Sequence, residues 1–138
     1  MLAPAWAPGA ALVALLAGCG GASNTISAPL ASPVQDPIAC ATEQGKARDY
    51  KVTNTDPARF VELTRVRAGN AGRNFRDYRQ SERLLVELVQ KPDKPVTLAV
   101  TSTLVVQRIT SAGPRTDIEP GAPETKADAR AVLDKCAK

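Results

Sequence analysis

Histidine is absent from the 138 residues of this chain, and only 4% of them are aromatic. Without histidine the sequence lacks the commonest general base and the commonest metal ligand, which excludes the Ser-His-Asp and Cys-His arrangements of nucleophilic catalysis. A phosphate-binding loop, a dinucleotide fingerprint and a calcium-binding loop are also missing. We therefore expect no catalytic residues, no metal and no cofactor, and a core built from Val, Leu, Ile and Ala.

Charged side chains are absent before Asp36 and unevenly distributed after it. Between Arg59 and Arg83 there are seven arginines and three acidic residues, a net charge of +4 that equals the net charge of the whole chain. Arginine binds phosphate and carboxylate groups through a planar fork of donors, so this stretch is a candidate anionic-ligand or partner patch. The alternative is a solvated strand face that protects a sheet edge. The candidate residues are Arg65, Arg67, Arg73, Arg76 and Arg79.

The first 18 residues form an uncharged leader whose apolar core runs from Ala10 to Ala17. That core is too short for a membrane-spanning helix, which needs about 20 residues, but it suits a signal peptide. It ends in Leu16-Ala17-Gly18-Cys19, which resembles the lipobox of bacterial lipoprotein precursors, although the leader has no Lys or Arg near its start. The resemblance implies cleavage before Cys19, covalent lipid on Cys19, export, and anchoring to the cell membrane or the outer membrane.

The chain after the leader divides into a connecting segment and one domain. Residues 19–37 are rich in Gly, Ser, Ala and Pro without periodicity, so we expect a flexible tether, with an irregular first strand as the alternative. Residues 38–138 suffice for a single small globular domain, which the resemblance places in the periplasm. Cys40 and Cys136 bracket this domain, and we expect a disulfide between them, since exported domains mature where disulfides persist. The alternatives are two buried thiols or a metal site.

The pattern of the domain is mainly β. Residues 96–110 alternate apolar and polar side chains with a period of two, as in a half-buried antiparallel strand, and shorter strands are expected at 48–53 and 84–89. Residues 59–67 fit a strand or a helix, and we favour the strand because the segment follows a strand and a tight turn. We expect a Gly/Pro loop at 111–122 and a C-terminal helix at 123–135. The prediction is a small antiparallel sheet or β-sandwich of four to five strands with a C-terminal helix, with an α+β layer as the alternative.

The leader, the tether and the arginines together favour a membrane-anchored envelope lipoprotein that is a non-catalytic binding or assembly module. Its expected partners are the membrane, through the lipid, and a protein or anionic envelope component at the arginines. Nucleic acid is not an expected partner of an exported chain. The alternative is a small periplasmic hydrolase or an enzyme inhibitor, and a hydrolase would need a concave pocket with convergent polar groups.

Overall fold

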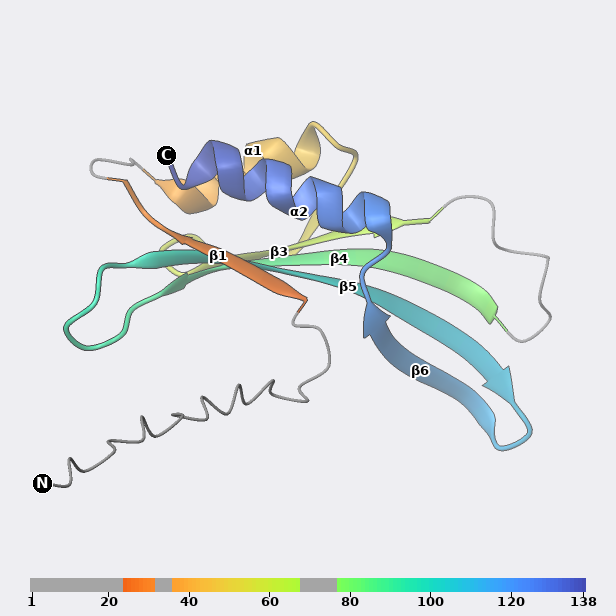
Figure 1. Ribbon diagram of the computed structural model, residues 1–138. Coiled ribbons are helices and arrows are strands. Elements are labelled where there is room, and N and C mark those ends of the chain that lie inside the picture. The colour runs from red at the N-terminus through yellow and green to blue at the C-terminus, as the bar shows by residue number, and fades with distance from the viewer. Residues whose placement is uncertain (1–23, 32–35, 68–76) are drawn as a thin grey trace, which may run out of the picture.

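The computed structural model describes residues 24–31, 36–67 and 77–138, which form one antiparallel sheet with two helices on one of its faces (Figure 1). The order of the hydrogen-bonded strands is β1-β5-β4-β3-β2, and β6 also pairs with β5. The fold is therefore mainly β with a C-terminal helix, as predicted, in two layers. The elements are β1 Thr25–Pro29, α1 Pro37–Lys46, β2 Lys51–Asp56, β3 Phe60–Val66, β4 Asp77–Val89, β5 Thr97–Thr110, β6 Gly113–Pro120 and α2 Pro123–Cys136.

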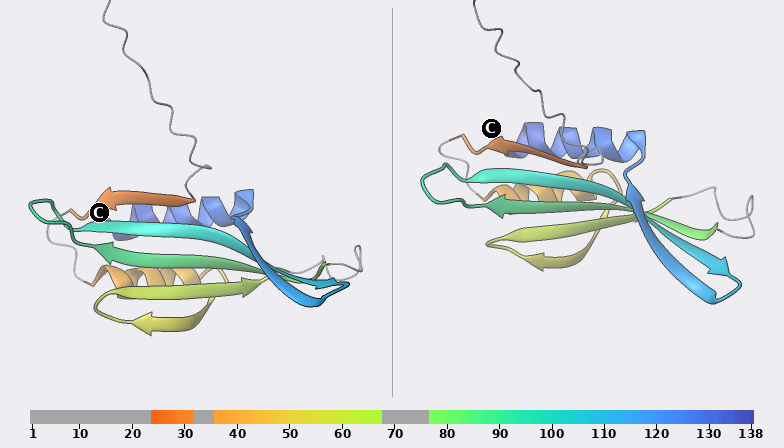
Figure 2. Two further views of the ribbon diagram at one scale, coloured as in Figure 1. Left: turned by 90° about the horizontal axis from the view of Figure 1, so that it is seen from below. Right: turned by 60° about the horizontal axis from the view of Figure 1, so that its bottom comes forward.

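The long strand β5 organises the sheet, since three other strands pair with it. One edge of β5 pairs with β4, and the other edge is shared by β1 along Thr97–Thr101 and by β6 along Thr103–Thr110. Figure 2 shows β1 and β6 following one another along this edge. The strand expected at 59–67 is β3, so the choice of strand over helix is confirmed.

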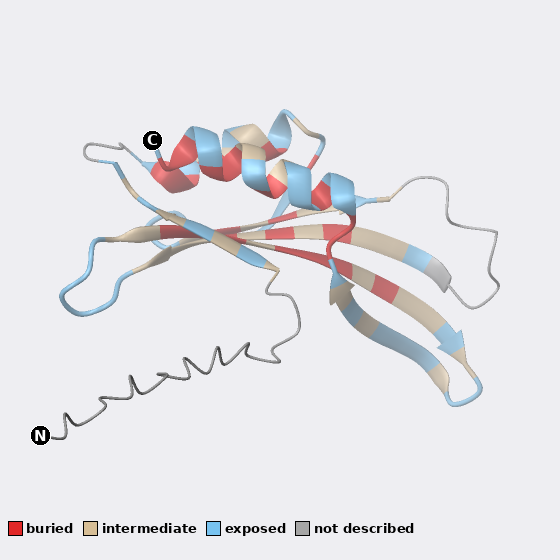
Figure 3. Cartoon of the chain, viewed as in Figure 1, coloured by how far each residue is buried: buried red, intermediate tan, exposed pale blue. Residues whose placement is uncertain are grey.

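The core lies between the helices and the middle of the sheet, where buried side chains alternate with partly buried ones along β3 and β4 (Figure 3). The period of two places every second residue of β3, β4 and β5 under the helices. Leu and Val dominate this layer, as the low aromatic content predicts. The buried strand residues are Val61, Leu63, Leu84, Val86, Leu98 and Val100, and the helices contribute Ile38, Ala41, Ala129, Val132 and Leu133.

Helix α1 begins at a strong local signal that the sequence analysis did not use. The side chain of Asp36 accepts a hydrogen bond from the backbone N–H of Ala39 at 3.0 Å, and Pro37 occupies the first turn. An acidic N-cap followed by proline is a typical helix start. Gly45 lies directly against the side chain of Leu63, and a Cβ atom there would approach Leu63 Cδ1 to 2.5 Å. The helix therefore packs closely on β3.

Two sequence predictions about chain segments are wrong. The tether expected over 19–37 contains β1, and the loop expected over 111–122 contains β6. Both are edge strands that carry proline, which the sheet tolerates because one side of each strand makes no ladder hydrogen bonds. The sheet thus includes Thr25–Pro29, which lie upstream of residue 38, and it has six strands rather than four or five.

Ion pairs stabilise the β5–β6 hairpin, which extends beyond the helix layer (Figure 1). Arg108 donates from Nη1 to Asp117 and from Nη2 to Glu119, both at 2.8 Å, and Arg115 Nε donates to Asp117 at 2.7 Å. The hydrogen bond from Arg108 is the main reason that the pKa of Asp117 lies below its usual value. Arg108 is directly opposite Arg115 on β6, and Asp117 is the diagonal neighbour whose carboxylate bonds to both arginines.

The predicted disulfide is confirmed. The sulfur atoms of Cys40 and Cys136 are 2.09 Å apart, and the bond joins α1 to α2 across 96 positions of the sequence. Cys136 is buried at the core side of α2, and Cys40 packs against the same core. The disulfide therefore fixes the two helices to each other on top of the sheet.

Candidate functional site

A cavity of about 630 Å³ opens beside the start of β2, where β3 continues past this edge strand. The ladder between these strands stops at the pair Lys51 and Thr64, so Arg65 and Val66 extend beyond the edge strand. On its other side β3 stays paired with β4 as far as Val66 and Ser81. We call this the basic cavity. Its lining residues are Asp49, Lys51, Thr53, Thr64, Arg65, Val66, Arg67, Arg79 and Glu82.

Three of the five arginines in the predicted patch line the basic cavity. Arg65 and Arg67 come from the end of β3, and Arg79 comes from the start of β4. The antiparallel register brings them together although 14 positions separate Arg65 from Arg79. Arg73 and Arg76 lie outside the described residues, so their place in the patch stays a prediction.

Arg65 is held in one orientation by three hydrogen bonds. Its Nε donates to Glu82 at 2.6 Å, its Nη2 to Asp128 at 2.9 Å, and its Nη1 to the carbonyl of Arg48 at 2.7 Å. Its guanidinium also stacks over the ring of Tyr50, 4.3 Å from the ring centroid. This one side chain therefore joins β3 to β4, to α2 and to the loop after α1. Arg65 is thus a fixed, structural part of the cavity lining.

The partners of Arg65 are themselves satisfied. Tyr50 donates its hydroxyl to Asp128 at 2.9 Å, and the buried Thr125 donates to Glu82 at 2.8 Å. Burial and then the bond to Asp128 raise the pKa of Tyr50 well above its usual value, so this phenol stays a donor. Burial alone would favour protonated Glu82, but hydrogen bonds from Arg65 and Thr125 outweigh it and lower the pKa of this carboxyl. The cluster is therefore a closed network of hydrogen bonds and ion pairs.

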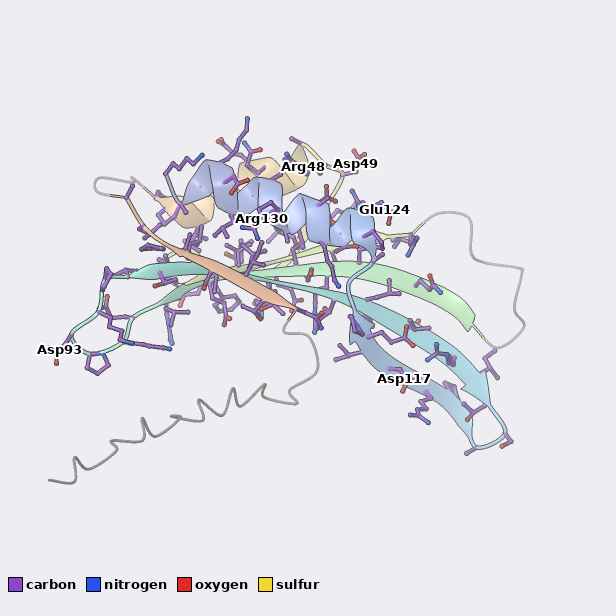
Figure 4. All side chains as sticks on the ribbon, viewed as in Figure 1. Arg48, Asp49, Asp93, Asp117, Glu124 and Arg130 are labelled. Atoms are coloured by element: carbon purple, nitrogen blue, oxygen red, sulfur yellow. A yellow bond between two sulfur atoms is a disulfide. The ribbon has the colours of Figure 1, made fainter. Side chains whose placement is uncertain are left out.

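The other cations of the cavity are available to a ligand. Arg67 Nη2 is 3.8 Å from the carboxylate of Glu124, which is 68% exposed, so this pair contributes little. Lys51 and Arg79 are exposed, and neither forms an ion pair or side-chain hydrogen bond with the rest of the described chain. Figure 4 shows Glu124 at the first turn of α2 and Asp49 at the loop after α1. Four basic and two acidic lining residues give the cavity a net charge of +2.

The lining of the basic cavity carries hydroxyl, guanidinium and ammonium groups. The hydroxyls of Thr53 and Thr64 lie 3.0 Å apart, and Thr53 donates to the carboxylate of Glu62 at 2.8 Å. Across the described residues, no group of three or more Cys, Asp or Glu is placed to hold a metal ion. Guanidinium and ammonium donors suit phosphate and carboxylate oxygens.

Sequence reasoning missed the groups that fix Arg65. Glu82 is opposite Arg65 in the strand register, and Asp128 is on a helix 63 positions away. A hairpin register for β3 and β4 would have paired Arg65 with Glu82, but the sequence analysis expected the second strand only from residue 84. The position of Asp128 depends on how α2 crosses the sheet, which no local pattern encodes.

The predicted lipidation site and the disulfide have different outcomes. Cys19 lies outside the described residues, so lipidation stays a prediction. Cys40 and Cys136 are paired with each other. No helix in the described part of the chain has the length and hydropathy needed to cross a membrane.

Comparison with known proteins finds no match to this chain among family models, curated proteins or solved structures. Its function must therefore be inferred from its own residues and their geometry.

Proposed function

We propose that this chain is an exported envelope lipoprotein, anchored through Cys19, whose domain is a non-catalytic binding module for an anionic group. The leader supports the anchor, because its apolar core ends in Leu16-Ala17-Gly18-Cys19. The disulfide between Cys40 and Cys136 supports export, because disulfides persist in oxidising compartments. The basic cavity supports binding.

The observation that carries the binding proposal is the contrast between Arg65 and its neighbours. Arg65 is neutralised by Glu82 and Asp128, whereas Arg67 and Arg79 present guanidinium groups to the same cavity with little internal compensation. Unpaired cations around a concave site attract anions and hold them by charge-assisted hydrogen bonds. A phosphate or carboxylate group on a protein or envelope polymer therefore fits the basic cavity.

Reversing the charge at the basic cavity should weaken binding of anionic polymers. With the full chain in detergent, we expect Arg67→Glu together with Arg79→Glu to weaken binding of polyphosphate and of polyglutamate by about tenfold or more, since each charge-assisted bond contributes about 1.5–3 kcal/mol. Isothermal titration calorimetry measures both affinities. The polymer that binds with the higher affinity shows whether the cavity prefers phosphate or carboxylate groups.

The matched control is Lys91→Glu together with Lys94→Glu, which changes the net charge equally in the exposed turn between β4 and β5. We expect the affinity of this control to stay within about twofold of that of the unmodified chain, because salt screens surface charges that lie far from the binding site. Equal losses in both variants would show attraction to the net charge alone, and the cavity would then not be the binding site.

The anchor has its own test. Intact mass spectrometry of the chain extracted from native membranes should give the mass of residues 19–138 plus acyl chains, because processing before Cys19 removes the leader. Reduction should add two hydrogens as the disulfide opens. The mass of the unmodified full chain would contradict the lipoprotein proposal, and Cys19→Ser should abolish the acyl mass.

A further inference from the structure

A second cavity, of about 340 Å³, lies between α2 and the pair formed by β1 and β5. It is on the opposite side of α2 from the basic cavity, and Figure 4 shows Arg130 on the side of α2 that faces β1. We call it the strand-edge cavity. Its lining residues are Asn24, Ile26, Ser102, Lys126, Ala127, Ala129 and Arg130.

Helix α2 separates its charges between the two cavities. Glu124 and Asp128 face the arginines of β3, where they form ion pairs with Arg67 and Arg65. Lys126 and Arg130 are also four positions apart, and therefore share the other face of the helix. Two like charges at this spacing repel each other, which makes a bound anion between them favourable.

The cations of the strand-edge cavity have no acidic partner in the described chain. Neither Lys126 nor Arg130 makes an ion pair or a side-chain hydrogen bond with another described residue. The side-chain oxygen of Asn24 is buried and, within the described residues, also has no hydrogen-bond partner. A buried carbonyl oxygen without a donor is rare in folded proteins and calls for one from a ligand or water. The cavity thus offers two cations to an anion and one acceptor to a hydroxyl.

The position of this cavity relative to the leader limits the source of the ligand. Asn24 is five residues after Cys19. An extended chain spans at most ~3.6 Å per residue, so the Cα atoms of Cys19 and Asn24 are within about 18 Å of each other. If Cys19 carries lipid, as the proposed function holds, the strand-edge cavity opens within reach of the membrane surface. Strand β1 begins immediately after Asn24, so the connection between Cys19 and the sheet is short.

We propose that the strand-edge cavity binds the headgroup of an anionic phospholipid beside the anchor, an inference that rests on the proposed lipidation of Cys19. Lys126 and Arg130 bind the phosphate, and a headgroup hydroxyl donates to the side-chain oxygen of Asn24. A phosphate ester with a free hydroxyl, such as the phosphoglycerol headgroup of phosphatidylglycerol, meets both requirements. The headgroup orients the sheet relative to the membrane, which the lipid on Cys19 alone does not do.

The test is lysine labelling of the full acylated chain in vesicles. The chain is reconstituted in phosphatidylcholine vesicles, with or without phosphatidylglycerol, treated with an amine-acetylating reagent and analysed by mass spectrometry. We expect phosphatidylglycerol to lower acetylation of Lys126 by about tenfold, as for a site that is mostly occupied. Acetylation of Lys135, on the same helix but outside the cavity, should stay unchanged.

Two variants and one soluble probe make the result specific. Arg130→Gln should abolish the protection of Lys126, whereas Arg115→Gln, on the exposed face of the β5–β6 hairpin, should leave it intact. Equal protection of Lys126 and Lys135 would show general attraction to the surface and overturn the proposal. A last outcome concerns soluble glycerol phosphate added to the chain in vesicles of phosphatidylcholine alone. If it protects Lys126 from acetylation without any anionic lipid, the assignment to a membrane lipid is overturned.

Flotation separates failure of this inference from failure of the anchor. An acylated chain floats with vesicles of pure phosphatidylcholine, and Cys19→Ser should not. A wild-type chain that fails to float on these vesicles contradicts the anchor, and with it the inference. A chain that floats but shows the same Lys126 acetylation with and without phosphatidylglycerol contradicts only the headgroup site.

Discussion

Replacing Cys40 and Cys136 together by alanine should lower the free energy of unfolding by about 4–5 kcal/mol. The disulfide closes a loop across 96 positions, and in the chain-entropy model a loop of about 100 residues stabilises the fold by about 4.7 kcal/mol. Small domains are stable by only about 5–15 kcal/mol, so the loss is a large fraction of the total. Urea denaturation of the full chain, in a Cys19→Ser background that removes the third thiol, measures it.

Reductant supplies the control for this prediction. Dithiothreitol should destabilise the protein with both cysteines present by a similar amount, and should leave the alanine variant unchanged, because that variant has no disulfide to open. A variant as stable as its parent would show that helix packing alone holds α1 and α2 in place. The domain would then need no oxidising compartment in order to fold.

Replacing Arg65 by methionine should destabilise the fold by about 3 kcal/mol. Methionine keeps the length of the side chain but removes the cation shared by Glu82 and Asp128. Removing one partner of a buried ion pair costs about 3–5 kcal/mol, and the lower end applies because Arg65 is 24% exposed while Glu82 is only 5% exposed. Chemical denaturation measures the loss, and Glu82→Gln in the methionine background should recover part of it by removing the unpaired charge.

The pH dependence of stability is the signature of this network. The pKa of Glu82 is lower in the folded protein than its ordinary value of 4.5, so its ionised form stabilises the fold above that value. This stabilisation is lost as the pH falls through the lowered, folded-state pKa. Arg65→Met should make the decrease in stability with falling pH smaller.

The control for the Arg65 variant is Arg83→Met, which removes a 3.9 Å pair with the half-buried Glu62. It should change the free energy of unfolding by less than about 1 kcal/mol. Similar losses in the two variants would contradict a special role for Arg65.

The parts of the fold that the sequence predicted are those with an unambiguous period. β5 places Leu98, Val100, Leu104 and Val106 on one face, and α2 begins at a proline and carries its apolar residues on one face. Both patterns arise because one face of each element is buried, so its apolar residues recur with the period of the strand or the helix. The disulfide followed from the redox compartment that the leader implies and from the position of the two cysteines.

The missed elements have weaker signals for physical reasons. In β1 only Ile26 and Ala28 are partly buried, and in β6 five of the eight residues are exposed and two are prolines. Such edge strands have compositions close to those of loops, because a neighbouring strand supplies their hydrogen bonds on one side only. The basic cavity was predicted only in part, since Arg65 and Arg67 are close in sequence but Lys51 and Asp128 meet them only after the sheet and helix are packed.

The order of β1, α1 and the disulfide along the chain determines how the domain carries mechanical force. A pull on the chain upstream of Asn24 first strips β1 from the edge of β5, because only five residues of β1 are paired there. Extension then stops at Cys40, since its bond to Cys136 gives the force a second path. From that point the load divides between α1 and α2 and reaches the sheet from both ends of the closed loop. A partner held in the basic cavity would thus be retained under tension after the first strand has peeled away.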